Sequence, residues 1–261
     1  MTFPPYRDRY LPAMTPGRIR ALADKSWAPV LLATGAIEQH GPHMPVAVDA
    51  LMGQVWLSLA ISRLPAGASC YVAPPITIGK SNEHTGFPGT LMISRDTLRS
   101  QVLAVAQQVH AWGFRTLAVI NTHGGNVPVL VPTLREARAF YGLRAAILQS
   151  RPAAGISAQE AAFGIHAGEV ETSWIMAAAG RLVDISKAVR EYPARIGDPG
   201  EVRPVGAPAL VAWASLDVSR SGIMGDAPAA SAEKGERWLE QGAAGYAEAI
   251  AELCRSGRQS P

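Results

Sequence analysis

Cysteine is scarce in this sequence, with only two thiols, Cys70 and Cys254, among 261 residues. Their wide separation matches no zinc-thiolate or redox spacing, so we expect buried or incidental thiols in a reducing compartment. Long apolar runs are missing as well, which argues against a membrane-spanning helix. Prolines and charges interrupt the first residues, where a secretory signal needs an apolar core. We therefore expect a soluble cytoplasmic protein with no membrane partner.

Charge of one sign is also lacking, because the formal net charge is only +3 and the arginines are scattered. Without a basic stripe interleaved with aromatic residues, nucleic-acid binding is not expected. The chain has neither the P-loop lysine pattern nor the dinucleotide fingerprint GxGxxG, and it has no G-x-S-x-G elbow. These absences argue against a nucleotide-phosphate cradle and against a serine nucleophile.

What the sequence does contain is an alternation of buried strands and helices in a globular composition, with 48% apolar and 17% charged residues. The length suits one domain, residues 1–261. Continuous apolar runs and helical spacings of apolar residues alternate along the chain. This order predicts an α/β fold of three layers, α/β/α, with a mostly parallel central sheet. The strands are expected at residues 29–34, 71–73, 116–120 and 143–148, and the helices after Thr15, after Asp49, and at residues 94–112, 127–142, 167–179 and 230–253.

Polar residues gather where these strands are expected to end. The first cluster is EQHGPH at residues 38–43 with Asp49 downstream, the second NTHGGN at 121–126, and the third HAGEVETS at 166–173. Five of the six histidines lie in or near such loops. Because ligands bind beyond the carboxyl ends of parallel strands, the three clusters are candidates for one shared site.

The residue types in these clusters indicate a metal site. Glu38 and His40 are two apart, so an extended segment would direct both side chains to the same side. Asp49 could bridge two cations through its separate oxygens. Imidazole and carboxylate together suit Zn²⁺, Mn²⁺ or Fe²⁺, and no thiolate favours zinc in particular. Gly124 and Gly125 would let the backbone approach a metal or substrate closely.

The motifs EQHGPHMP with Asp49, HGGN and HAGEVETS closely resemble those of the creatininase (creatinine amidohydrolase) family. Two weaker stretches are also similar: SNEHTGFPGT at residues 81–90, and GIMGD at 222–226 with Glu233-Lys234-Gly235. The resemblance runs from about residue 29 to residue 235 in the family's order. It implies a creatininase-like α/β/α fold, two divalent metal ions per subunit and hydrolysis of cyclic or linear amides by homo-oligomers, with a hexamer favoured.

The resemblance also implies roles for individual residues. Glu38, Asp49 and His123 would hold one metal ion, and His40 with the bridging Asp49 would hold the other. The second ion needs another carboxylate. Creatinine-cleaving members supply a glutamate two residues after the histidine of HGGN, where this chain has Gly125. Glu169 is the predicted replacement and is counted among the catalytic residues, with Glu171 as the alternative, and His166 is the predicted acid/base group.

Four further residues are candidates for substrate binding: Glu83, His84, Gly124 and His43. A capped turn would explain Glu83 and His84 almost as well, and His43 could instead fix its loop through hydrogen bonds.

These assignments lead to a functional hypothesis. Two divalent ions sharing a water would lower its pKa and provide a nucleophile at neutral pH. We therefore expect a dinuclear hydrolase that cleaves the C–N bond of a small cyclic amide, lactam or imide. Because HGGN replaces the creatininase pattern at Gly125, a formamide deformylase or a mycofactocin-type peptidase is the alternative. A third hypothesis is a non-catalytic oligomeric protein that binds a small molecule.

Overall fold

The computed structural model describes residues 4–193 and 212–259, and its centre is a parallel sheet of four strands in the order β2-β1-β3-β4. Every pairing in this sheet is parallel. The central pair β1 and β3 is in register from Val30 opposite Leu117 to Thr34 opposite Asn121. The strands are β1 (Val30–Thr34), β2 (Tyr71–Val72), β3 (Thr116–Asn121) and β4 (Arg144–Ile147).

The apolar runs form buried strands because both faces of the sheet are covered. Alternate residues of a strand point to opposite faces, and β1 shows this division. Leu31 and Ala33 join one hydrophobic cluster, whereas Val30 and Leu32 join the other. A continuous apolar run is therefore what this position in the sheet requires.

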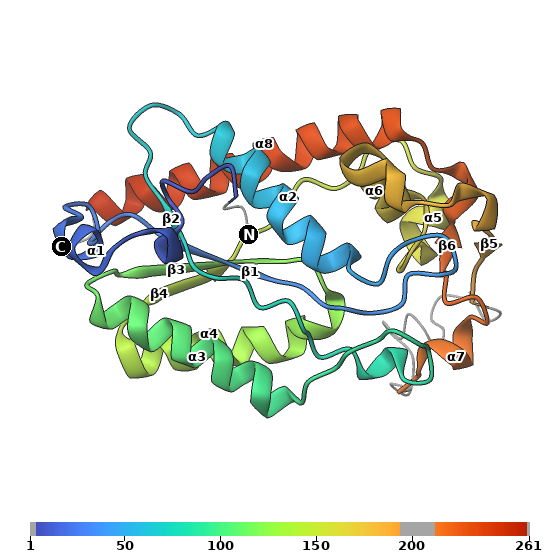
Figure 1. Ribbon diagram of the computed structural model, residues 1–261, viewed down its shortest axis with the longest axis horizontal. Coiled ribbons are helices and arrows are strands. Elements are labelled where there is room, and N and C mark those ends of the chain that lie inside the picture. Colours follow the sequence, from blue (N-terminus) through green and yellow to red (C-terminus); the bar gives the residue numbers. More distant parts are fainter. Residues whose placement is uncertain (1–3, 194–211, 260–261) are drawn as a thin grey trace.

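Helices form the two outer layers (Figure 1). One layer contains α2 (Val48–Ser62), α6 (Glu169–Ala179) and the long α8 (Ala232–Gln259), which pack on one another. The other layer contains α3 (Arg95–Ala111) and α4 (Val127–Tyr141). The predicted three-layer α/β/α fold with a parallel central sheet is confirmed.

Local sequence signals set several helix ends. Thr15 Oγ1 accepts a hydrogen bond from Arg18 N at 3.3 Å and caps α1 (Pro16–Ala21), which has proline in its first turn. Ser94 Oγ caps α3 in the same way, accepting from Thr97 N at 3.0 Å. Within residues 4–193 and 212–259, no helix combines the length and the apolar character needed to cross a membrane.

Smaller elements surround the carboxyl end of the sheet and were not predicted. They are α5 (Ala158–Phe163), α7 (Ser215–Val218) and an antiparallel pair formed by β5 (Arg190–Glu191) and β6 (Gly225–Asp226). Such short pieces carry too few residues for a periodic signal. Beside them, His166 pairs with Met224 through a β-bridge, and Gln39 of the loop after β1 donates to Gly222 O.

Candidate metal centre

The candidate site lies at the carboxyl ends of the two central strands, where parallel α/β sheets bind their ligands. Glu38 follows β1, His123 follows β3, and Asp49 is in the first turn of α2. The side chains are deeply buried, since Glu38, Asp49 and His123 are only 1%, 3% and 4% exposed. Three residues that are far apart in the sequence therefore meet in one buried cluster.

Asp49 stands between two imidazoles, because each of its carboxylate oxygens faces a different one. Oδ1 is 3.5 Å from His40 Nε2, and Oδ2 is 3.4 Å from His123 Nδ1. The backbone of Asp49 is fixed by Thr122 Oγ1, which donates to its carbonyl at 2.8 Å. Gly35 packs so closely against the start of α2 that a Cβ there would lie 2.9 Å from backbone atoms of Asp49. A carboxylate in this position can serve two cations at once.

Backbone carbonyls determine which nitrogen of each imidazole carries the proton. His40 Nδ1 donates to Glu38 O at 3.1 Å, and His123 Nε2 donates to Lys80 O at 3.1 Å. A carbonyl can only accept, so these two nitrogens keep their protons. The opposite nitrogens, His40 Nε2 and His123 Nδ1, therefore face the carboxylates, and in the neutral rings these are the nitrogens that carry the lone pairs. Metal-binding histidines are commonly oriented in this way.

His166 enters the cluster from the segment before α6. Its Nε2 donates to Gln39 O at 2.7 Å, which leaves Nδ1 facing Glu38 Oε1 at 3.8 Å. The ring lies between those of His40 and His84, with centroids 4.3 and 4.4 Å away. The next residue, Ala167, is buried at a φ of 52°, a left-handed conformation that non-glycine residues adopt only where the surroundings enforce it.

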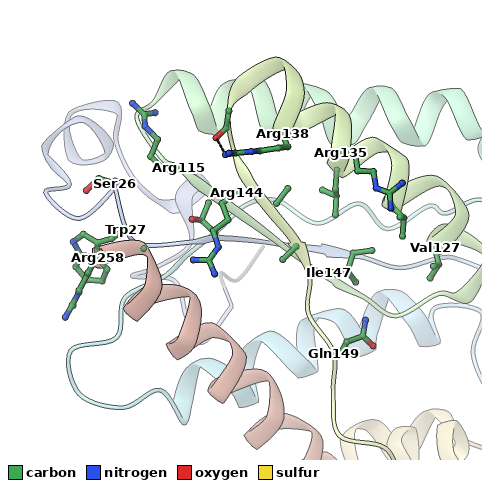
Figure 2. A pocket seen from close by; sticks show the side chains of 17 residues that line it. Ser26, Trp27, Arg115, Val127, Arg135, Arg138, Arg144, Ile147, Gln149 and Arg258 are labelled. Atoms are coloured by element: carbon green, nitrogen blue, oxygen red, sulfur yellow. Dashed lines mark hydrogen bonds between the residues drawn. The ribbon is translucent and has the colours of Figure 1, made fainter. Parts of the chain in front are cut away.

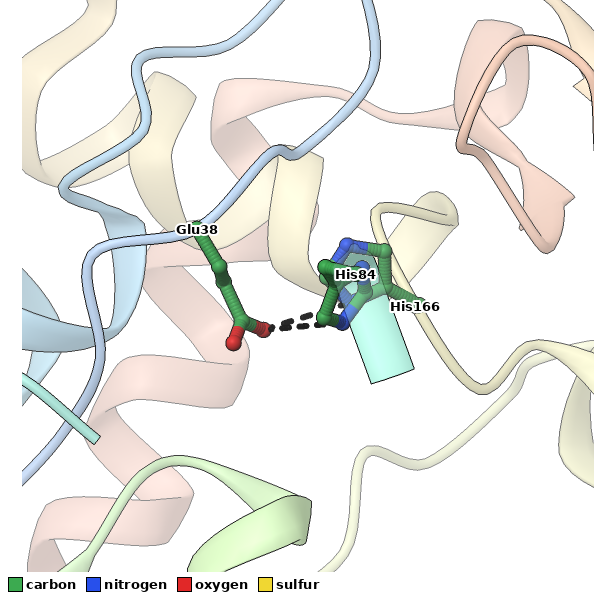
Figure 3. A group of neighbouring side chains, drawn as sticks. All are labelled: Glu38, His84 and His166. Carbon is green, nitrogen blue, oxygen red and sulfur yellow. Dashed lines mark ion pairs between the residues drawn. The ribbon is translucent and has the colours of Figure 1, made fainter. Parts of the chain in front are cut away.

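His84 faces Glu38 with Nε2. The Gln39 amide is oriented by Gly41 N, which donates to Oε1 at 2.9 Å, and by Gly222 O, which accepts from Nε2 at 3.0 Å. The same Nε2 donates to His84 Nδ1 at 2.9 Å. The proton of His84 is therefore on Nε2, which lies 3.3 Å from Glu38 Oε1. Figure 3 shows the carboxylate of Glu38 pointing toward both His84 and His166.

Glu171, and not Glu169, faces this cluster. Glu171 Oε2 is 3.8 Å from His40 Nε2 and accepts from Ala167 N at 2.6 Å. Glu169 Oε1 instead accepts from Lys234 Nζ at 2.6 Å. Glu169 was expected to bind metal and to take part in catalysis, but in this structure its carboxylate is turned to a lysine of α8. Glu171, the alternative, forms a possible ligand group with His40 and His166.

The electrostatics of the cluster favour added positive charge. Burial alone would lower the pKa of His40, but the nearby carboxylates, Asp49 foremost, outweigh it and raise this pKa to about 9. Burial likewise opposes charge on His123, yet the adjacent carboxylates, Asp49 foremost, raise its pKa to about 12. Burial also raises the pKa of Glu171. Without a metal, protons are thus drawn to the nitrogens that face the carboxylates.

Whether these residues fit a metal can be judged from the buried polar atoms that have no hydrogen-bond partner. Glu38 Oε2, His40 Nε2 and Asp49 Oδ2 are buried and have no hydrogen-bond partner among the described residues. An unsatisfied buried polar atom typically costs about 1–3 kcal/mol, so three in one place require a common partner. Imidazole nitrogens with carboxylate oxygens form a donor set for Zn²⁺, Mn²⁺ or Fe²⁺. The residues therefore fit divalent metal ions.

The residues expected to bind substrate divide into two groups. Glu83, His84 and Gly124 line a pocket of about 550 Å³ together with Glu38 and His123. Glu83 also contacts the buried cluster, since its Oε1 is 3.3 Å from His123 Nε2. Its other oxygen is 3.8 Å from Lys80 Nζ, a pocket-lining ammonium that the motifs did not indicate.

His43 does not line this pocket. It is buried, and its Nε2 donates to Thr172 Oγ1 at 2.8 Å, so it joins the loop after β1 to α6. Thr172 Oγ1 in turn donates to Ala167 O. Burial and the neighbouring His40 lower the pKa of His43 to about 4, so it is neutral at physiological pH. This position matches the structural alternative for His43, in which the side chain fixes its loop through hydrogen bonds.

Comparisons with known proteins agree with this geometry. The sequence model of the creatininase family, described as creatinine amidohydrolase, matches residues 12–250. The mycofactocin precursor peptide peptidase of Mycobacterium tuberculosis is 32% identical over 215 residues, covering 80% of this chain and 78% of that protein. The creatinine amidohydrolase of Pseudomonas putida is 30% identical over 250 residues, covering 85% and 88%.

Solved creatininase structures share the fold. One named "Creatininase Mn" superposes with a TM-score of 0.76 at 26% identity, over 94% of this chain and 98% of that one. A mutant creatininase of the Zn-Zn type gives 0.76 at 26% identity, over 93% and 97%. Fold, side-chain cluster and relatives together define a metal-dependent amidohydrolase. The chain belongs to the creatininase family, as its motifs predict.

Proposed function

We propose that this protein is a dinuclear metal-dependent hydrolase that cleaves the C–N bond of a small cyclic amide, lactam or imide. The observation that carries this proposal is the position of the Asp49 carboxylate. Its two oxygens face two different histidines, His40 and His123, on the ring nitrogens that do not contact a backbone carbonyl. Each carboxylate oxygen of Asp49 would thus bind one of the two ions. The expected location is the cytoplasm and the expected state a homo-oligomer.

Two ligand groups share the Asp49 carboxylate in this proposal. Glu38, Asp49 and His123 would hold one ion, while His40, Asp49 and Glu171 would hold the other. Zn²⁺, Mn²⁺ and Fe²⁺ all suit these donors. When bound, such ions polarise an amide carbonyl and lower the pKa of water, which makes a nucleophile available at neutral pH.

His166 would transfer the proton that an amide nitrogen needs in order to leave. Its Nε2 proton is held by Gln39 O, so only Nδ1 can take up and release a proton at the cluster. Burial, with His40 and His84 nearby, lowers the pKa of His166, which keeps Nδ1 free to accept. A proton received there can pass to the departing nitrogen, a role typically worth about 10²–10⁴ in rate.

Glu83 would orient a ligand as well as line the pocket. Together with Lys80 O it surrounds His123 Nε2, and a carboxylate behind a metal-binding histidine fixes the ring and raises its basicity. Gly124 has nothing within 4 Å of the position where its Cβ would be, so its backbone is open to a substrate.

A second function is favoured by one feature of the pocket. Lys80 Nζ lines it, and among residues 4–193 and 212–259 its ion pair is the 3.8 Å contact with Glu83, so it could bind a substrate carboxylate. A peptide C-terminus carries such a group. Together with the similarity to mycofactocin precursor peptide peptidases, this makes a specialised peptidase the alternative to a cyclic amidohydrolase.

A substrate panel separates the two functions. Purified enzyme loaded with Mn²⁺ or Zn²⁺ would be assayed on creatinine, lactams, cyclic imides, formamides and short peptides. Turnover of lactams or imides supports the first function, and turnover of peptides alone supports the second. Asp49→Asn is the control and should hydrolyse none of them. Activity that persists in this variant, or without divalent metal, would contradict both functions.

A further inference from the structure

A groove far from the metal-binding residues runs along the open edge of the sheet. It has a volume of about 1330 Å³, and none of its lining residues belongs to the metal cluster. Its floor is β4, and its walls come from α4 and from the C-terminal end of α8. Figure 2 shows β4 passing between these two helices, with arginine side chains on both sides.

The floor offers unpaired backbone groups. β4 is the last strand of the sheet, and among the described residues no further strand pairs with it. Arg144 N donates to Arg115 O, just before β3, at 2.9 Å, and Leu148 N donates to Val119 O of β3 at 2.8 Å. Because the backbone groups of successive residues point to opposite sides of a strand, those of Ala145 and Ile147 point to the open edge. Such an edge can accept another extended chain.

The charge of the groove is of one sign. Five arginines line it, no lining residue is acidic, and within residues 4–193 and 212–259 none of the five forms an ion pair with a carboxylate. Those with hydrogen bonds use neutral oxygens, such as Gly142 O for Arg138 and Ser256 Oγ for Arg144. The arginines are Arg115, Arg135, Arg138, Arg144 and Arg258.

Some arginines elsewhere on the surface are paired with acidic side chains. Arg63, Arg99, Arg151 and Arg255 each lie within 4.0 Å of a glutamate carboxylate. The groove therefore leaves guanidinium groups available, and these groups bind carboxylates in a bidentate manner.

The α4 wall is partly apolar and partly basic, because it also carries Arg135 and Arg138. On the α4 side, Val127 and Val131 are 41% and 40% exposed, and Ile147 of β4 packs in the cluster that contains α4. On the α8 side, Arg144 reaches Ser256, and Arg258 stacks over the Trp27 ring at 3.8 Å. A strand added to β4 would direct alternate side chains to these two walls.

We propose that this groove binds an extended acidic segment of another protein, which adds to β4 as a further strand. Alternate apolar side chains of the segment would pack against Val127 and Val131. The carboxylates between them would pair with Arg144 and Arg258 on the opposite wall. Main-chain hydrogen bonds to Ala145 and Ile147 would fix its register, as in other cases of strand addition.

The same features argue against other occupants. A second copy pairing β4 with β4 would bring the same arginines into the groove from both sides, and charged edge residues are a common protection against such self-pairing. A nucleic acid would supply phosphates, but it would neither fill the apolar part of the α4 wall nor continue the strand ladder. An acidic peptide satisfies all three features at once.

Fluorescence anisotropy of a labelled peptide tests this proposal. The probe is a peptide of about eight alternating glutamate and valine residues, within the usual length of a strand. We expect binding to the full chain that weakens as salt is added, because the contacts are exposed ion pairs. A lysine–valine peptide should not bind. A glutamate–valine peptide N-methylated at alternate residues should lose more than about tenfold in affinity, since it cannot donate to β4.

Variants connect the binding to the groove. Arg144→Gln with Arg258→Gln should weaken the acidic peptide more than about tenfold, while Arg237→Gln on the exposed surface of α8 should not. Arg144→Glu with Arg258→Glu should accept the lysine–valine peptide instead. All variants should keep wild-type unfolding temperatures and amide hydrolysis.

Several outcomes overturn the proposal. These are no binding of the acidic peptide, equal binding of the N-methylated one, or no effect of the arginine variants. Tighter binding of single-stranded RNA at the same arginines would also overturn it. So would light scattering that shows Arg144→Glu with Arg258→Glu to dissociate an oligomer, because the groove would then be an interface between copies of this chain.

Discussion

The carboxylate of Glu83 occupies the space that a side chain at residue 125 would need. A Cβ added to Gly125 would overlap both Glu83 Oε1 and His123 Nε2. These two atoms are 3.3 Å apart and form the contact that orients His123. The absence of a side chain at residue 125 is therefore a condition for this arrangement of Glu83 and His123.

Gly125→Ala should weaken metal binding, although residue 125 provides no ligand. The added methyl group would displace Glu83 from His123, and losing a carboxylate behind a metal-binding histidine typically costs about 10–100-fold in affinity. Metal titration by calorimetry measures this. Gly124→Ala is the matched control, because nothing lies within 4 Å of its Cβ position. In a Glu83→Ala background the Gly125→Ala effect should largely disappear, and full additivity would contradict the coupling.

His166→Ala should separate catalysis from metal binding. With His166 acting as a proton carrier, its loss should reduce kcat by about 10²–10⁴ while most of the bound metal remains. Turnover and metal content measured on the same preparation test this. His110→Ala, on α3, is the control and should change neither. A parallel loss of metal and activity in His166→Ala would instead make His166 a ligand.

Glu171→Gln should remove about half of the bound metal, since the ion on the His40 side would lose a carboxylate ligand. The other ion should remain with Glu38, Asp49 and His123. Metal analysis after dialysis gives the ratio. Glu169→Gln should retain the wild-type metal content, and the reverse result for these two variants would return the ligand role to Glu169.

Glu169→Gln should act on stability instead. Glu169 is 5% exposed and pairs with Lys234 Nζ, which also donates to Ala229 O at 2.7 Å. Removing one partner leaves a partly buried charge, and because the lysine side chain is 34% exposed we expect a loss of about 1–3 kcal/mol. Urea unfolding measures it. Glu169→Met combined with Lys234→Met should recover part of the loss, and an unchanged midpoint in Glu169→Gln would refute this role.

Removing metal should destabilise the whole fold. Glu38, Asp49 and Glu171 converge on a buried cluster, and an ion bound only by the native state adds RT ln(1 + [L]/Kd), about 4 kcal/mol at a thousandfold excess over Kd. Thermal unfolding before and after chelation should show a fall in Tm that Mn²⁺ or Zn²⁺ reverses. Asp49→Asn should not respond to either treatment. A wild-type Tm that is insensitive to the chelator would count against a structural contribution from metal.

Much of the fold follows from local sequence. The apolar runs of β1 and β3 are long enough to identify. Thr15 and Ser94 mark the starts of α1 and α3, because each accepts a hydrogen bond from the backbone N–H three residues further along the chain. The β5–β6 pair could not be predicted, because each strand has two residues and its partner lies more than thirty positions away.

The candidate site was predictable in its residue types but not in every role. Successive helix residues are rotated by about 100°, so Glu169 and Glu171 point in nearly opposite directions, and the exact phase of α6 decides which one faces His40. The role of His84 depends on Gln39 and Gly222, which lie 183 positions apart. Such contacts leave no periodic signal in the sequence.

The close contact of Gly35 with the start of α2 limits how this enzyme can change over evolutionary time. Any side chain at residue 35 would press on the main chain of Asp49, so a substitution there would have to move the start of α2 and Asp49 with it. A broader substrate range could arise more easily beside Gly124, which lines the pocket and has no atom within 4 Å of its Cβ position.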